Sequence, residues 1–219
     1  MELGSHQARR IKTRHLQADS EGAISVAAEL LRNGQVVAFP TDTVYGIGGA
    51  AFDPEAVEGL FLVKGRPLHK GIPVLLADVT DLERVAVRIS EEATALIERF
   101  WPGPLTLILP KHPDLPSIVS SNDGVAVRIP DSDVARALIR AAGGAVATSS
   151  ANLSDRTPAR SGLEAFSALD GLIAAVLDAG ACPHQMASTI LDCRGSAPLI
   201  VRHGPILPTS ISLTTSPQS

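Results

Sequence analysis

The sequence contains few of the residues that mark metal-binding and disulfide-rich proteins. Only two of its 219 residues are cysteines, Cys182 and Cys193, and their spacing does not form a CxxC pair. No histidine lies near them at the spacing of a zinc site, so we expect two reduced thiols, as is usual for a cytoplasmic protein. Aromatic residues make up only 3% of the chain, so the core is expected to be mainly aliphatic.

Surplus basic charge and long apolar runs are also absent. The formal net charge of −4 gives the whole protein no attraction to nucleic acid or to acidic membranes, so such binding would need a local basic patch. No run of about eighteen apolar residues is present, and the basic N-terminus lacks the apolar segment of a secretory signal. We therefore expect no membrane association. With 45% apolar residues, the chain can form one continuous globular core.

Helical and strand patterns alternate along the chain, but several strands follow one another directly. Apolar spacing, capping residues and terminal glycines predict helices at residues 19–34, 53–65, 90–103, 131–144 and 161–169. Asp19 or Ser20 is expected to cap the first of them. Apolar runs predict strands at residues 35–39, 72–77, 104–110, 124–130, 145–148, 173–180, 188–193 and 198–204. This order favours an α/β fold with a mixed parallel and antiparallel sheet and flanking helices.

The two ends of the chain differ from the predicted domain. Residues 1–18 read as a polar arm, for which a short edge strand is one option. Residues 206–219 are rich in Ser, Thr and Pro and are expected to form a flexible tail. No internal repeat or linker divides residues 19–205, so we expect one domain.

Four polar segments lie at the ends of predicted strands or helices, where open α/β sheets usually bind ligands. They are PTDTVYG at 40–46, KGRPLHK at 64–70, TSSANLSDRTP at 148–158 and VRHG at 201–204. Arg128 is a fifth candidate, because a charged side chain in an apolar strand is costly unless it has a partner. Strand alternation places it opposite Val125 and Val127, so it faces either solvent or a cavity.

Each segment also has a purely structural interpretation. Cations after the helix at 53–65 are stabilised by the helix dipole, although an Arg and Lys cluster equally suits a polyphosphate. The hydroxyls at 148–154 can form turns or a helix cap as readily as they can contact a nucleotide or an amino acid. The glycines at 46–49 do not fit GxGxxG, and the chain has neither a P-loop nor a GxSxG motif. A dinucleotide fingerprint, a P-loop ATP site and a hydrolase serine are therefore not indicated.

Six motifs, taken in order, make the sequence resemble the threonylcarbamoyl-AMP synthase family, whose members contain a YrdC-like domain. The motifs are PTDTVYG, KGRP, VAVRIP, SSANLS, STILD and VRHG, and the resemblance covers about residues 22–205. It implies a single-domain twisted mixed α/β sheet with flanking helices around a large concave basic cavity. It also implies the short form of the family, because the chain ends before a second domain could follow.

The resemblance implies a nucleotidyltransferase activity. Family members condense L-threonine, bicarbonate and ATP to threonylcarbamoyl-adenylate and pyrophosphate, and the product serves the threonylcarbamoyladenosine modification of tRNA. The resemblance assigns L-threonine binding to Thr43, Arg128, Thr148 and Ser188, with Arg128 on the carboxylate. It assigns ATP binding to Lys64, Arg66, Lys70, Ser150, Asn152 and Arg202. No covalent nucleophile and no protein-bound metal are expected, whereas Mg²⁺ is expected as a cofactor that accompanies ATP.

The sequence departs from the family pattern at three places. KGIP at residues 70–73 replaces the common KPL, Leu75 replaces a histidine found in some members, and Asp155 stands where glycine is common. The roles of Lys70 and of the loop around Asp155 therefore stay open.

Two other functions stay open. One is a carbamoyl-adenylate enzyme with another acceptor, like the related domains of larger hydrogenase-maturation carbamoyltransferases, for which this chain has no room. The other is a binding module for double-stranded RNA or tRNA without catalysis, which the acidic net charge disfavours. Pyrophosphate release that depends on both threonine and bicarbonate would distinguish them. Direct binding of tRNA and of downstream threonylcarbamoyl-transfer proteins also stays open.

Overall fold

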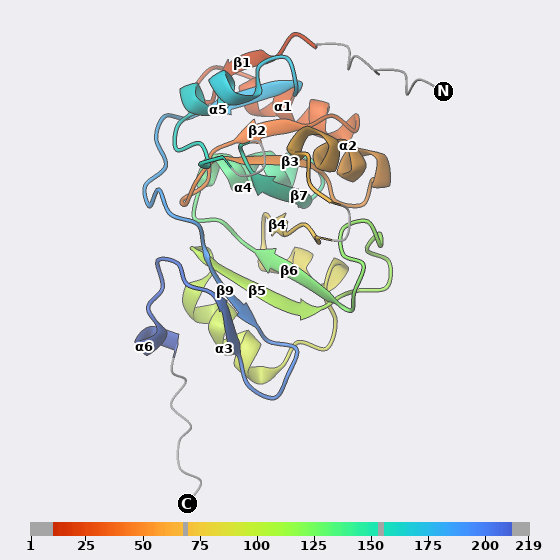
Figure 1. Ribbon diagram of the computed structural model, residues 1–219, viewed down its shortest axis with the longest axis vertical. Helices are drawn as coiled ribbons and strands as arrows, with labels where there is room; N and C mark the ends of the chain where they lie inside the picture. Colours follow the sequence, from red (N-terminus) through yellow and green to blue (C-terminus); the bar gives the residue numbers. More distant parts are fainter. Residues whose placement is uncertain (1–10, 68–69, 153–155, 212–219) are drawn as a thin grey trace, which may run out of the picture.

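The computed structural model of the protein describes residues 11–67, 70–152 and 156–211. Within these residues, ten strands form one sheet in the order β1-β8-β2-β3-β7-β4-β6-β5-β9-β10. In Figure 1 the strands run from β1 at the top to β9 near the bottom, with helices on both sides. The strands are β1 Arg14–Gln17, β2 Val37–Phe39, β3 Gly46–Ala50, β4 Val74–Leu76, β5 Leu105–Pro110, β6 Gly124–Arg128, β7 Ala145–Ser150, β8 Ala175–Asp178, β9 Thr189–Asp192 and β10 Leu199–Arg202.

The sheet is mixed, as the sequence predicts. Parallel pairs join β1 to β8, β2 to β8, β4 to β6 and β5 to β9, while the remaining neighbours are antiparallel. The helices are α1 Ala23–Arg32, α2 Pro54–Lys64, α3 Glu91–Phe100, α4 Asp133–Ala141, α5 Gly162–Leu169 and α6 Pro208–Ile211, with a 3-10 helix at Val79–Arg84.

The helices divide the core into two clusters, one on each face of the sheet. Apolar residues of α2, α3 and α5 pack on one face, and those of α1 and α4 pack on the other. The α1 and α4 cluster reaches β2, β4, β7 and β8. The same face carries no described helix over β5 and β9, which leaves room there for a cavity.

Strand β3 is the main element that the sequence analysis missed. Its sequence GIGGA has three glycines, which favour a turn over a strand. The glycines are required by close packing: a Cβ on Gly48 would lie 2.5 Å from Val146 Cγ1 and 2.9 Å from the Phe39 ring. A Cβ on Gly46 would lie 2.7 Å from the Thr148 methyl carbon. The glycine-rich end of PTDTVYGIGG therefore allows β3 to enter a crowded sheet.

Most predicted helix caps are present. Asp53, Ser90 and Ser132 accept hydrogen bonds from the first turns of α2, α3 and α4. The predicted cap of α1 is wrong, because Gly22 occupies the N-cap in a left-handed conformation and makes no side-chain hydrogen bond. The chain turns just before it, with Ala23 N donating to Ser20 O, so Ser20 lies outside the helix.

The described residues of both terminal segments belong to the fold. Inside the predicted arm, β1 is an edge strand that pairs in parallel with β8. Inside the predicted tail, Ile206 is buried in the core and α6 follows. Residues 1–10 and 212–219 lie outside the described residues. No helix in the described part of the chain has the length and hydropathy needed to span a membrane.

Candidate functional site

A cavity of about 380 Å³ occupies the open part of the sheet. Residues of β3, β4, β5, β6, β7, β9 and β10 line it. The lining positions alternate along β5 and β6, as expected for strands with one face toward the cavity, whereas three consecutive residues at the end of β7 line it. Leu75 belongs both to the lining and to the cluster under α1 and α4, so the cavity lies on the face of these helices. Seven of the ten predicted site residues line it: Thr43, Arg66, Arg128, Thr148, Ser150, Ser188 and Arg202.

The loop between β2 and β3 carries Thr43 into the cavity. Thr41 organises this loop: its hydroxyl donates to Val44 O at 2.7 Å and lies 2.9 Å from the Thr43 hydroxyl. Thr41 Oγ1 also accepts from Thr43 N at 3.1 Å. The polar residues of PTDT thus hold the conformation of this loop at the edge of the cavity, and both threonines line the cavity.

Arg128 faces the cavity, not solvent, and its fork is already engaged by the protein. Nε donates to Gly103 O and Nη1 to Thr43 Oγ1, both at 2.9 Å, and Nη2 forms an ion pair with Asp42. Both members of the pair are almost completely buried. Burial lowers the pKa of Arg128, and Asp42 opposes that effect. The sequence gives no sign of this pair, because nothing in the spacing connects Asp42 to Arg128, which is 86 residues away.

Arg66 is fixed at the end of α2 by backbone oxygens. Its Nε donates to Lys70 O at 3.0 Å and its Nη2 to Gly71 O at 2.9 Å. Burial lowers the pKa of Arg66. Lys70 thus contributes its carbonyl to this arrangement, while its side chain is exposed and lies outside the cavity lining.

Lys64 is the last residue of α2 and connects this helix to the end of β7 and the residues that follow it. Its Nζ donates to Ser150 O at 2.7 Å, to Asn152 O at 2.7 Å and to Asn152 Oδ1 at 2.5 Å. Ser150 Oγ accepts a further bond at 3.1 Å. Burial, with Arg66 nearby, lowers the pKa of Lys64 to about 8. The structure brings Lys64, Ser150 and Asn152 together, but only Ser150 reaches the lining.

Ser188, the residue before β9, meets Arg202, the last residue of β10, at the far end of the cavity. Arg202 Nε donates to Ser188 O at 2.9 Å and Nη2 to Ser188 Oγ at 3.0 Å. Burial of the guanidinium lowers the pKa of Arg202. Thr106 of β5 completes the group, with its hydroxyl 2.8 Å from Ser188 Oγ. The sequence analysis missed Thr106, although it is a polar residue in the apolar stretch PLTLILP.

Thr148 lies on the cavity face of β7, and its hydroxyl donates to Val146 O at 3.1 Å. Its amide donates to Pro73 O at 2.7 Å. The loop departure at Asp155 lies outside the described residues. Leu75, the second departure, contributes an apolar surface to the lining.

The cavity is electropositive. Three arginines and no carboxylate line it, and only Arg128 has a carboxylate partner within the described residues. Arg66 and Arg202 donate only to uncharged oxygens, so their charges are available to an anion. In the same described part of the chain, no cluster of three or more His, Cys, Asp or Glu side chains could hold a metal ion.

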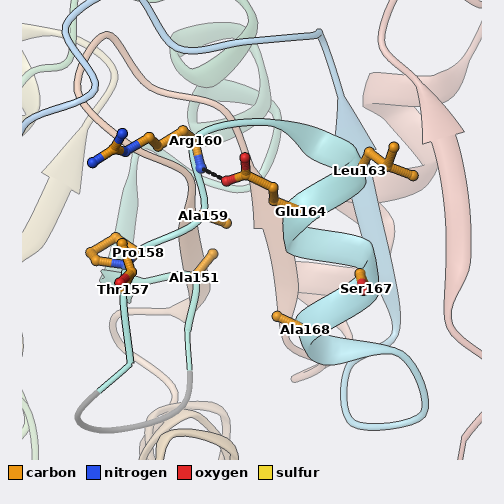
Figure 2. Close-up of a pocket in the computed structure, with 9 residues that line it drawn as sticks. All are labelled: Ala151, Thr157, Pro158, Ala159, Arg160, Leu163, Glu164, Ser167 and Ala168. Carbon is orange, nitrogen blue, oxygen red and sulfur yellow. Dashed lines mark hydrogen bonds between the residues drawn. The ribbon is translucent and has the colours of Figure 1, made fainter.

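A second cavity of about 620 Å³ lies between residues 157–160 and α5. Figure 2 shows Glu164 turned back to accept from Arg160 N at 2.7 Å, while the Arg160 side chain extends away from the helix. Pro158 lines both cavities, but none of the ten predicted site residues lines this one. The candidate site is therefore the cavity over the sheet.

Comparison with known proteins identifies relatives over most of the chain. The chain is 41% identical over 196 residues to threonylcarbamoyl-AMP synthase of Bacillus subtilis, covering 89% of this chain and 57% of that protein. It is 39% identical over 188 residues to the putative threonylcarbamoyl-AMP synthase of Mycobacterium tuberculosis, covering 85% of this chain and 86% of that protein. The chain thus spans little more than half the length of the Bacillus relative.

A solved structure agrees with these relatives. The crystal structure of Pyrococcus abyssi Sua5 complexed with L-threonine superimposes with a TM-score of 0.84 at 37% identity, covering 89% of this chain and 58% of that one. The family model Sua5/YciO/YrdC, described as "Telomere recombination", matches residues 29–204. The resemblance drawn from the six motifs is thereby confirmed, and the chain belongs to the Sua5/YciO/YrdC family, which includes the threonylcarbamoyl-AMP synthases.

Proposed function

We propose that the protein is an L-threonylcarbamoyladenylate synthase. It would join L-threonine and bicarbonate to a carbamate, with loss of water, and transfer the carbamate to the α-phosphate of ATP, with release of pyrophosphate. The observation that carries the proposal is the cavity itself, in which two arginines that have no carboxylate partner among the described residues lie beside several small hydroxyl groups.

ATP would bind through these two arginines. A guanidinium held by neutral oxygens keeps its full charge for a phosphate, and the surrounding protein strengthens that attraction relative to water. Arg66 and Arg202 lie on segments at different edges of the cavity, so they can hold different parts of one nucleotide. Ser150 adds a small hydroxyl, and Lys64 and Asn152 act by fixing the loop that carries it.

Threonine would bind near Arg128, Thr43, Thr148 and Ser188. Arg128 keeps N–H groups beyond those that contact Asp42, Thr43 and Gly103, because a guanidinium has five in all. The carboxylate of threonine would use them. The Pyrococcus relative is described as complexed with L-threonine, which supports an amino-acid site in this fold.

Magnesium enters the proposal as the counter-ion of ATP. The cavity lining holds no carboxylate, so the described residues do not form a resident metal site. Mg²⁺ would instead arrive on the phosphates and neutralise the leaving pyrophosphate.

The reaction needs positioning more than a nucleophilic side chain. Carbamates decompose readily in water, so holding amine, bicarbonate and α-phosphate together in a deep site accounts for much of the acceleration. Arg66 and Arg202 would stabilise the charge that develops as pyrophosphate leaves. The product would then serve tRNA modification, through proteins that accept the threonylcarbamoyl group in the cytoplasm.

The test is pyrophosphate release by the purified chain with MgATP, bicarbonate and L-threonine. We expect release only when all three are present, with threonylcarbamoyl-adenylate detected by mass spectrometry. Equal release with and without threonine would refute the substrate assignment. No release, together with salt-sensitive binding of double-stranded RNA or tRNA, would favour the binding module instead.

A further inference from the structure

The hydroxyl pair formed by Thr106 and Ser188 joins a predicted site residue of the cavity to one that lies in none of the six motifs. The two oxygens are 2.8 Å apart, and both residues are at least 95% buried. Thr106 is the only polar side chain of β5, where its neighbours Leu105 and Leu107 face the opposite core. A polar residue in this position costs stability unless it has a partner or a role.

Counting hydrogens in this pair leaves one donor for a ligand. Arg202 can only donate, so Ser188 Oγ is the acceptor in the bond from Nη2. Of the two hydroxyl hydrogens, one joins Thr106 to Ser188. The other has no acceptor among the described residues, whichever hydroxyl carries it. Thr106 Oγ1 also keeps an unused lone pair. The two hydroxyl groups together can therefore both donate a hydrogen bond to a ligand and accept one from it.

The pair lies beside the residue that would hold the substrate carboxylate. β5 and β6 are antiparallel, with Leu107 opposite Val127 and Ile108 opposite Ala126. Continuing this register places Thr106 beside Arg128 on the cavity face, one strand spacing away. In a β-hydroxy amino acid, the carboxylate and the hydroxyl are attached to adjacent carbons. These two groups can therefore reach Arg128 and the hydroxyl pair together.

We propose that the Thr106 and Ser188 pair recognises the β-hydroxyl of the amino-acid substrate, and that Thr106 is a specificity-determining residue. The inference rests on the proposed function and adds the group that selects threonine. A substrate hydroxyl satisfies the spare donor and the spare lone pair together. An amino acid without that hydroxyl leaves both buried and unpaired, which is a strong basis for rejection.

Binding of L-threonine and L-valine, measured by calorimetry without ATP, tests this directly. L-Valine has a methyl group where L-threonine has the hydroxyl, so its shape is nearly the same. We expect the wild-type chain to prefer L-threonine by about 100-fold or more. In Thr106→Val we expect the affinity for L-threonine to fall by roughly 10- to 100-fold while that for L-valine is unchanged or higher.

Two further variants separate recognition from folding. Thr106→Ser keeps the hydroxyl and should keep the preference for L-threonine. Thr189→Val removes another buried hydroxyl on β9 that lies outside the cavity and bonds to Ile206, so it should leave the preference unchanged. A wild-type ratio of affinities in Thr106→Val, or a lost preference in Thr106→Ser, would overturn the inference alone. Absence of L-threonine binding by the wild-type chain would overturn the proposed function as well.

Discussion

Replacement of Asp42 by alanine is expected to destabilise the protein strongly. Asp42 is the only described carboxylate that pairs with Arg128, and both side chains are buried. Its Oδ1 also accepts from Asp131 N at 3.1 Å. The substitution leaves a buried guanidinium charge without a counter-charge, together with an unpaired amide.

The magnitude follows from the burial of the pair. Breaking a buried ion pair by removing one partner costs about 3–5 kcal/mol. For a domain of this size, 1 kcal/mol corresponds to a change in Tm of about 2–4 °C. We therefore expect Asp42→Ala to lower the Tm by roughly 6–20 °C. Thermal unfolding followed by circular dichroism measures this change.

Asp114 is the matched control. Within the described part of the chain it pairs only with His112, and its side chain is 84% exposed, so Asp114→Ala should change the stability by less than about 0.5 kcal/mol. Adding Arg128→Met to Asp42→Ala should recover part of the lost Tm, because the uncompensated charge is then removed. If Asp42→Ala lowered the Tm no more than Asp114→Ala, the pair would not be the buried, mutually dependent contact described here.

Three further outcomes are expected. Arg66→Ala should weaken ATP binding by roughly 10- to 150-fold in calorimetry, because a charge-assisted contact is lost. Lys111→Ala, which changes a residue outside the cavity, should leave ATP binding unchanged. Equal ATP affinities of the two variants would show that Arg66 does not bind the phosphates. ATP affinity should fall as the pH rises through about 8, because Lys64 loses its proton there and releases the loop at Ser150. The same lowered pKa makes the unfolded chain bind more protons than the folded one above pH 8, so the stability contribution of Lys64 rises with pH in that range. If Lys64 causes this pH dependence, the ATP affinity of Lys64→Met should not change with pH. A pH dependence of ATP affinity in Lys64→Met equal to that of the wild-type chain would contradict this role. Gly48→Ala should cost about 1–3 kcal/mol in urea unfolding, because its Cβ would meet Val146 and Phe39; a wild-type midpoint would contradict this packing.

The sequence predicts the helices and most strands because their signals are local. Asp53 followed by Pro54 and closed by Gly65 marks α2 at both ends, and the structure has these boundaries. β3 could not be predicted in this way. Its glycines are selected by the nearness of Val146 and Phe39, which are far from it in the sequence.

For the candidate site too, the sequence predicts what local motifs indicate and misses what depends on distant residues. Residues with a polar motif around them, such as Thr43 and Ser150, could be proposed from the sequence and do reach the cavity. The contacts that hold these residues in place could not be predicted from the sequence. The sequence indicates Lys64 as a candidate ATP-binding residue, but it does not indicate that the ammonium group donates to oxygens of Ser150 and Asn152, which are 86 and 88 residues away.

The sequence carries one signal for Thr106. Arg128 is a candidate because a charged residue interrupts the apolar strand GVAVRIP, and the cost of burying it demands a partner. The same reasoning applies with less force to a hydroxyl in PLTLILP, since burying a hydroxyl costs less than burying a charge. Strand alternation places Thr106 opposite the core face of Leu105 and Leu107, just as it places Arg128 opposite Val125 and Val127. A polar residue inside an apolar strand therefore indicates a cavity even when it is neutral, and two such residues on neighbouring strands indicate the same cavity.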